Sequence, residues 1–205
     1  MSAATPASRE ARAYLRRVDP VMAGVIRQVG PYRPNLRRGR SHFHDLVRSI
    51  VYQQLSGKAA GTIHGRVVAL FPRKHVDPAR LLRLSDESLR GAGLSRQKVA
   101  YLRDLADKVH TGAVPLHRVG RMTDDAIIAH LVQVKGVGRW TAQMFLMFRL
   151  GRPDVLPELD LGIQNAVQRA YGLRRRATPD DVRRIGAAWR PYCSVACWYL
   201  WRSLD

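Results

Sequence analysis

Hydrophobic residues recur at intervals of three and four along most of the chain, whereas the strict alternation typical of strands is almost absent. In FHDLVRSIVYQQL, the side chains of Phe43, Leu46, Val47, Ile50 and Val51 fall on one helical face. The same spacing predicts further helices over residues 59–70, 124–134, 140–150, 160–171 and 182–204, and two more that begin after residues 85 and 95. The pattern therefore predicts a compact all-α protein.

Polar residues mark where several of these helices begin. Ser85, Ser95 and Thr123 each precede an apolar stripe, and a side-chain oxygen at that position caps the first backbone N–H groups. The first residues of the chain are small and polar, so residues 1–12 are predicted to form a disordered tail and residues 13–205 the folded core.

Charge narrows the choice of partners. The 205 residues include 35 Lys and Arg against 16 Asp and Glu, a formal net charge of +19. Such an imbalance makes a polyanion the leading class of partner. The alternative is a solvated basic surface that only aids solubility.

The cysteines and the terminal segments indicate a protein of a reducing compartment. Cys193 and Cys197 are four apart in a predicted helix, where two side chains on one face make a poor disulfide, so we expect buried thiols. The N-terminus lacks the apolar region of a signal peptide, and no run is long enough to span a membrane, which favours a cytoplasmic protein. The seven histidines do not have zinc-site spacing, and we expect them at the surface or satisfied in the core.

One short turn between two predicted helices carries the first functional signal. In LVQVKGVGRWTAQ, Gly136 and Gly138 permit a tight turn that can approach another surface closely. Lys135, Arg139 and Thr141 surround it, and the next helix would point free backbone amides outward, as phosphate-binding sites require. A glycine turn in a helical hairpin is often structural, but in a strongly basic chain phosphate binding is the better interpretation.

Several motifs, in order, resemble one family. They are FHDLVRSIVYQQLSGKAA, GLSRQKVAYLRDLA, the hairpin LVQVKGVGRWTA, Pro157 with Asp160 opening a helix, and WRPYCSVACWYLW near the C-terminus. Over residues 13–204 this set resembles the helix-hairpin-helix (HhH-GPD) superfamily of DNA glycosylases, and most closely its 3-methyladenine DNA glycosylase II type. Relatives with lyase activity place a Schiff-base lysine where this chain has Trp140, and others carry a four-cysteine cluster that is absent here.

The resemblance implies a two-lobed helical fold with a central cleft. Lobe one would span about 41–150 and include the hairpin at 131–142, and lobe two would combine 13–40 with 160–205. It implies a monofunctional glycosylase that hydrolyses the N-glycosidic bond of alkylated purines, such as 3-methyladenine and 7-methylguanine, in duplex DNA during base excision repair. The rival hypothesis is a helix-hairpin-helix protein that binds DNA or recognises damage without chemistry.

The resemblance also assigns a catalytic acid. In VLPELDLGI, two carboxylates stand among apolar residues, where an unpartnered charge is unfavourable. By the family pattern Asp160 stabilises the positive sugar carbon and orients the water, although Asp is also a common helix cap. Glu158 is expected to be an exposed loop residue.

Aromatic residues would recognise the base, because an alkylated purine is cationic and aromatic faces attract cations. The family pattern places Trp140, Trp189 and Met144 in this pocket, while Trp198 and Trp201 are expected in the core. Leu55 would fill the gap left by the flipped base, beside Gln53 and Gln54, with core packing as an equal alternative for Leu55.

No cofactor is implied beyond a structural ion. In the family the hairpin often holds a monovalent cation through backbone carbonyls, which here would be those of Val132, Val134 and Val137 binding Na+ or K+. The expected partner is double-stranded DNA containing alkylated bases, with the protein acting as a monomer associated with the nucleoid.

Overall fold

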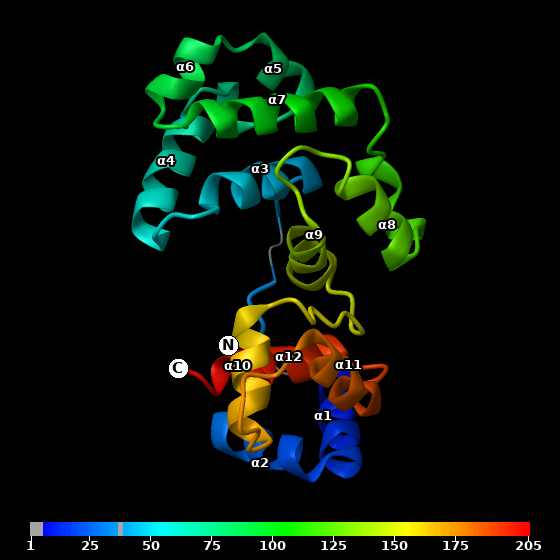
Figure 1. Ribbon diagram of the computed structural model, residues 1–205. Coiled ribbons are helices and arrows are strands. Elements are labelled where there is room, and N and C mark those ends of the chain that lie inside the picture. The colour runs from blue at the N-terminus through cyan, green and yellow to red at the C-terminus, as the bar shows by residue number, and fades with distance from the viewer. Residues whose placement is uncertain (1–5, 37–38) are drawn as a thin grey trace. The chain divides into compact units, whose positions relative to one another are not determined.

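The computed structural model describes residues 6–36 and 39–205, and every regular element in those ranges is helical. The chain divides into two units (Figure 1). Unit 1 combines the N-terminal segment up to Leu36 with Leu146–Asp205. Unit 2 is the part of the chain between these two segments, and it ends at Phe145. This confirms the predicted all-α class. Like the predicted lobe two, unit 1 combines an N-terminal with a C-terminal segment.

Two boundaries differ from the prediction. Residues 146–150 were expected in the same lobe as the hairpin, but they form a π-helical turn, Leu146–Leu150, that belongs to unit 1. The physical reason is packing, since the Phe148 ring lies 5.8 Å from that of Trp201. Residues 39 and 40, expected in lobe two, belong to unit 2.

Unit 2 is built around its longest helix, α7 (Arg96–His110), which packs against α3, α5 and α6 (Figure 1). The side chains that close its core are aliphatic, including Leu46, Ile50, Leu81 and Leu102. Its other helices are α3 (His42–Tyr52), α4 (Gly57–Ala69), η1 (Pro72–Lys74), α5 (Pro78–Arg83), α6 (Asp86–Gly91), η2 (Leu116–Arg121), α8 (Asp124–Leu131) and α9 (Arg139–Phe145).

Unit 1 is built around α12 (Cys193–Arg202), which packs against α1, α2 and α10 (Figure 1). Cys193 and Cys197 are free and buried in this helix, as expected, and burial raises the pKa of both thiols. The other helices of the unit are α1 (Pro6–Val18), α2 (Pro20–Val29), η3 (Leu146–Leu150), α10 (Leu161–Ala170), α11 (Pro179–Gly186) and η4 (Ala187–Trp189).

The helix starts predicted from the sequence are confirmed. Ser85, Ser95 and Thr123 each accept a hydrogen bond from the backbone N–H three residues ahead. The predicted tail was wrong in part, since residues 6–12 form the first turns of α1, while residues 1–5 lie outside the described residues. None of the helices in the described ranges combines the length and apolar character that a membrane crossing needs.

Candidate functional site

Asp160 is the N-cap of α10 in unit 1. Its backbone is extended, and its Oδ1 accepts a hydrogen bond of 2.8 Å from the backbone N–H of Ile163. Negative charge is stabilised near the N-terminus of a helix, where the dipole is positive. The capping role that the sequence left as an alternative is therefore real, and it does not compete with chemistry at the same group.

A second donor reaches the same oxygen from α12. The indole Nε1 of Trp201 donates to Asp160 Oδ1 at 2.9 Å, across 41 residues of sequence. Trp201 was expected to be a core residue, but its side chain is only partly buried and forms part of the Asp160 site. The sequence offered one indirect signal, which is the glycine in the first turn of α10. A Cβ at Gly162 would lie 3.1 Å from Trp201 Nε1.

Exposed leucines flank the acid. Leu159 and Leu161 are 51% and 59% exposed, among the most exposed large hydrophobic side chains of the described residues. The prediction for Glu158 was wrong, because its side chain is only 12% exposed and pairs with Arg183 at 3.5 Å. Asp160 is partly buried and lies between these two exposed leucines in the chain.

The hairpin of unit 2 is the turn between α8 and α9, and it is docked on α7. Gly136 has a φ of 76°, and an added Cβ would lie 2.1 Å from a ring carbon of Tyr101, so only glycine fits. The backbone N–H of Lys135 donates to Asp104 Oδ2 at 2.8 Å. This amide therefore holds the turn in place, and the amides that the sequence suggested for a phosphate are those at the start of the next helix, α9.

The Asp104 carboxylate that accepts from the hairpin is itself stabilised in its ionised form. Partial burial opposes its ionisation, but hydrogen bonds from the Lys108 ammonium and the Lys135 backbone outweigh burial and hold the pKa of Asp104 below its usual range. The hairpin thus rests on an ionised carboxylate, which is a stronger acceptor than a neutral group.

The predicted wedge turn lies directly beside the hairpin. The side-chain Nε2 of Gln53 donates to the Gly136 carbonyl at 2.8 Å, a contact between residues 83 apart in sequence. Lys98 of α7 donates to the carbonyls of Val51 and Gln53 at 2.6 and 2.8 Å, which closes the end of α3. The sequence had placed Gln53 near DNA, but the structure gives it a supporting contact within the protein.

The tip of this turn is exposed. Gln54 has a positive φ of 56°, unusual for a residue with a side chain, and Leu55 after it is 40% exposed. Between the two readings left open for Leu55, exposure favours the wedge over core packing. Backbone strain of this kind is often found where function requires a fixed shape.

Helix α9 carries part of the predicted base pocket. Trp140 is 45% exposed, and Met144, one helical turn further on, is partly exposed on the same side of the helix. Arg139 and Lys135 are exposed, as a phosphate contact requires. Thr141 is only 6% exposed, which argues against a phosphate contact by its side chain.

Trp189 does not line an accessible surface. It is fully buried in unit 1, and its Nε1 donates to Asp19 Oδ2 at 2.8 Å. Asp19 also accepts from the Tyr171 hydroxyl and caps α2. A ring without accessible surface cannot stack on a base, so the structure assigns Trp189 to the core.

The hairpin carbonyls of Val132, Val134 and Val137 were predicted to hold a monovalent cation, and this stays a prediction. Val132 ends α8, and the Val134 carbonyl accepts from the Val137 N–H at 3.0 Å, which uses one of its two lone pairs. The described residues contain no group of three His, Cys, Asp or Glu that could hold a metal. Backbone carbonyl oxygens are hard ligands of the kind that such cations prefer.

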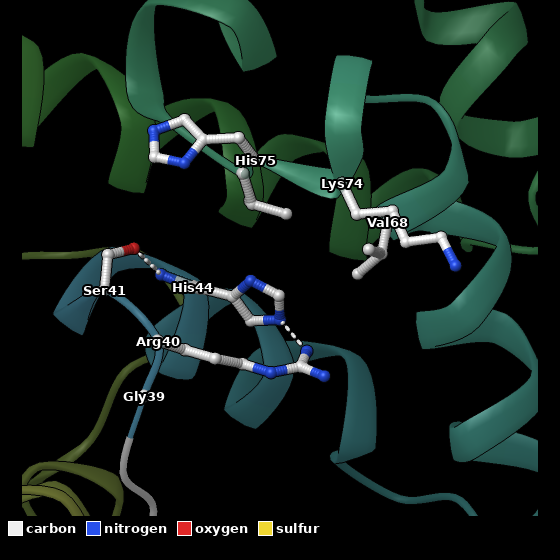
Figure 2. A pocket seen from close by; sticks show the side chains of 8 residues that line it. Gly39, Arg40, Ser41, His44, Val68, Lys74 and His75 are labelled. Atoms are coloured by element: carbon white, nitrogen blue, oxygen red, sulfur yellow. Dashed lines mark hydrogen bonds between the residues drawn. The ribbon is translucent and has the colours of Figure 1, made fainter.

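A basic pocket of about 350 Å³ opens at the start of α3 (Figure 2). Arg40 donates to Nε2 of the buried His44 at 2.6 Å, and Lys74 and His75 face the same space (Figure 2). Burial first, and then Arg40, Arg48 and His75, lower the pKa of His44 to about 4. His44 is therefore a neutral core residue, as expected, and accepts from the guanidinium.

The predicted residues thus fall into two groups. Unit 2 brings together Gln53, Leu55, the hairpin and α9, and unit 1 holds Asp160. The cleft predicted between the lobes stays a prediction. Sequence reasoning missed Trp201, and it missed the three residues of α7 that support the hairpin and wedge turn, Lys98, Tyr101 and Asp104.

Comparison with known proteins gives one consistent result. The family model described as HhH-GPD superfamily base excision DNA repair protein matches residues 47–191. DNA-3-methyladenine glycosylase 1 of Schizosaccharomyces pombe is 31% identical over 201 residues, covering 95% of this chain and 86% of that protein.

Solved structures agree with the sequence match. The crystal structure of DNA-3-methyladenine glycosidase from Bacillus halodurans superposes with a TM-score of 0.86 at 36% identity, covering 99% of this chain and 91% of that one. The Schizosaccharomyces pombe 3-methyladenine DNA glycosylase in complex with abasic DNA gives a TM-score of 0.83 at 30% identity, covering 95% and 96%. The chain therefore belongs to the HhH-GPD superfamily of base excision DNA repair proteins.

Proposed function

We propose that this protein is a monofunctional DNA glycosylase that removes alkylated purines of the 3-methyladenine and 7-methylguanine type from duplex DNA. The observation that carries the proposal is the Asp160 carboxylate, held by two donors at the start of α10 and bordered by exposed leucines. Relatives named as 3-methyladenine DNA glycosylases, one of them solved with abasic DNA, support the substrate class and the partner.

Asp160 acts where positive charge develops. As the bond between C1′ and the base nitrogen breaks, both bonding electrons leave with the cationic base, which departs neutral, and the sugar takes on oxocarbenium character. A fixed carboxylate stabilises that cation without having to reorganise. A water oxygen then bonds to C1′, and its proton passes to Asp160 or to solvent.

Unit 2 supplies binding. The side chains of Lys135 and Arg139 contact backbone phosphates, while Leu55 enters the stack when the nucleotide is flipped out. The exposed face of Trp140, with Met144 beside it, attracts the cationic purine. Trp140 stands where lyase relatives carry a lysine, which supports hydrolysis without strand cleavage. The protein acts as a monomer.

The carbonyls of Val132, Val134 and Val137 would hold Na+ or K+, and no organic cofactor is needed. A cation bound there would add positive charge to the hairpin and favour a phosphate. DNA affinity should then be several-fold higher in KCl than in tetramethylammonium chloride of equal ionic strength. Equal affinity in both salts would exclude the ion.

The test of the activity is release of the base. Wild-type protein should liberate 3-methyladenine and 7-methylguanine from methylated duplex DNA, and Asp160→Asn should not. Asparagine is as good a helix cap as aspartate, so this variant removes the charge and keeps the fold.

A matched control is available in unit 2. Asp77 caps α5 by accepting from the Arg80 N–H at 2.9 Å, so Asp77→Asn changes a capping aspartate far from the proposed chemistry in sequence. It should retain full activity. If wild type binds DNA but releases no base, the protein is a non-catalytic binder, and if Asp160→Asn stays active, the catalytic assignment is wrong.

A further inference from the structure

We infer that Trp201 positions the carboxylate of Asp160 through its indole N–H. We also infer that Gly162 provides the space that this hydrogen bond needs. This inference rests on the proposed catalytic role of Asp160. It assigns a function to a tryptophan and a glycine that lie outside the hairpin.

Two hydrogen bonds fix the orientation of the Asp160 carboxylate. Asp160 Oδ1 accepts from two directions, from the Ile163 N–H at 2.8 Å along α10 and from Trp201 Nε1 at 2.9 Å on α12. A single donor leaves a carboxylate free to turn about χ2, which is a soft torsion. Two donors on one oxygen fix the plane of the group, and so fix the direction in which the other oxygen points.

The two donors to Asp160 Oδ1 carry no charge. Both are neutral N–H groups, and an indole N–H donates without accepting or titrating. A lysine or arginine at position 201 would also anchor the oxygen, but it would cancel the negative charge that the oxocarbenium-like sugar requires. Tryptophan fixes the carboxylate and leaves its charge intact.

The indole ring of Trp201 lies close to Phe148 and to Gly162. The Trp201 ring packs on Phe148, with ring centroids 5.8 Å apart and the planes 35° from parallel. A Cβ added at Gly162 would lie 3.1 Å from both Trp201 Cδ1 and Nε1 and 3.0 Å from Asp160 Oδ1. Both distances are tighter than ordinary contacts, so a side chain at position 162 requires the donor or the acceptor to shift by a few tenths of an ångström.

Gly162 is otherwise hard to explain. It lies inside the first turn of α10, where glycine is a poor helix former, and its φ is not in the left-handed region that would require glycine. A backbone that must be approached closely is the remaining physical reason for glycine in such a place.

The experiment compares three variants under single-turnover conditions on methylated duplex DNA. Trp201→Phe keeps an aromatic ring and removes the N–H, Gly162→Ala adds the crowding methyl, and Trp198→Phe removes an indole from the same helix. Trp198 packs on Tyr32 and Tyr199 instead, with ring centroids 4.9 and 5.0 Å away.

Trp201→Phe should lower the single-turnover rate roughly ten- to hundredfold, the effect expected for one hydrogen bond to a charged group. Its affinity for DNA containing an abasic-site analogue should be unchanged, because the residue acts on the chemical step. Trp198→Phe should change the rate less than threefold.

Gly162→Ala separates positioning from folding. Alanine is the better helix former, so thermal stability should hold or rise while the rate falls. The Nε1–H resonance of Trp201 in ¹⁵N-labelled wild type should move when Asp160 is changed to Asn, which reports the contact even if Trp201→Phe folds poorly.

Each outcome decides the question. If Trp201→Phe is no slower than Trp198→Phe, or if Gly162→Ala keeps the wild-type rate, the positioning role is overturned. If Trp201→Phe does not fold, the Gly162→Ala rate and the Nε1–H shift decide alone. Loss of activity in Asp160→Asn alongside an active Trp201→Phe would leave the proposed function standing and remove only this inference.

Discussion

The side chain of Gln53 holds the hairpin by a hydrogen bond of 2.8 Å from its Nε2 to the carbonyl of Gly136. Gln53 belongs to the turn that presents Leu55, so the predicted wedge and the predicted phosphate-binding turn are joined directly. Lys98 completes the link, because it donates to the Gln53 carbonyl from α7. The two turns that are predicted to act on DNA at different points therefore share one support within unit 2.

Gln53→Ala should loosen that support. Removing one neutral hydrogen bond costs about 0.5–1.5 kcal/mol, so affinity for damaged duplex should fall by roughly two- to tenfold. Hydrogen exchange of the amides of residues 134–138 should speed up by a similar factor. Gln133→Ala removes an exposed glutamine from the same hairpin and is the control. Identical exchange in both variants would show that the Gln53 contact does not order the turn.

The two hairpin glycines should behave differently. Gly136→Ala places a methyl group 2.1 Å from the Tyr101 ring at a φ that disfavours side chains, so the thermal midpoint should drop by several degrees. A Cβ at Gly138 meets nothing within 4 Å, so Gly138→Ala should fold normally. If close approach to DNA is what position 138 requires, that second variant should still bind DNA more weakly. Equal stability losses in a calorimeter would contradict this division.

These elements show what local sequence can and cannot predict. The helices, their caps and the hairpin can be predicted from spacing and residue type within about ten positions. Asp160 can be singled out as the candidate catalytic acid from the motif that contains it. Trp201 could not be found that way, because its bond to Asp160 spans 41 residues and depends on how α10 packs against α12. The prediction that Trp189 lines the base pocket failed for the same reason. The motif fixes the position of Trp189 in the chain but not whether its ring faces solvent or Asp19.

The buried histidine pair should make stability depend on pH. The rings of His44 and His64 lie 5.2 Å apart, and burial, followed by nearby cationic groups that include Arg40 and Arg48, lowers the pKa of both to about 4. His44 also contributes to the lowered pKa of His64. His75 adds to the effect at His44. Because the unfolded chain binds these protons near the ordinary value of 6.5, their contribution is complete above that pH and is lost as pH falls toward about 4.

The measurement is urea unfolding between pH 7 and pH 4. The free energy of unfolding should decline more steeply for wild type than for His64→Gln, which cannot take up the proton. His110→Gln changes an exposed histidine and should follow the wild-type slope. Parallel slopes for all three proteins would mean that the pair does not titrate with folding.

Lys135 should bind phosphate with its side chain alone, because its backbone N–H is committed to Asp104 at 2.8 Å. Its side chain is exposed at the tip of a turn that Tyr101 and Gln53 hold in place. Lys135→Ala should therefore weaken binding to damaged and undamaged duplex alike, and should reduce the slope of log K against log salt by about 1. Arg90→Ala removes an exposed charge from α6 and should leave the slope unchanged. A loss confined to damaged DNA would instead place Lys135 in recognition of the lesion, since a phosphate contact carries no information about the base.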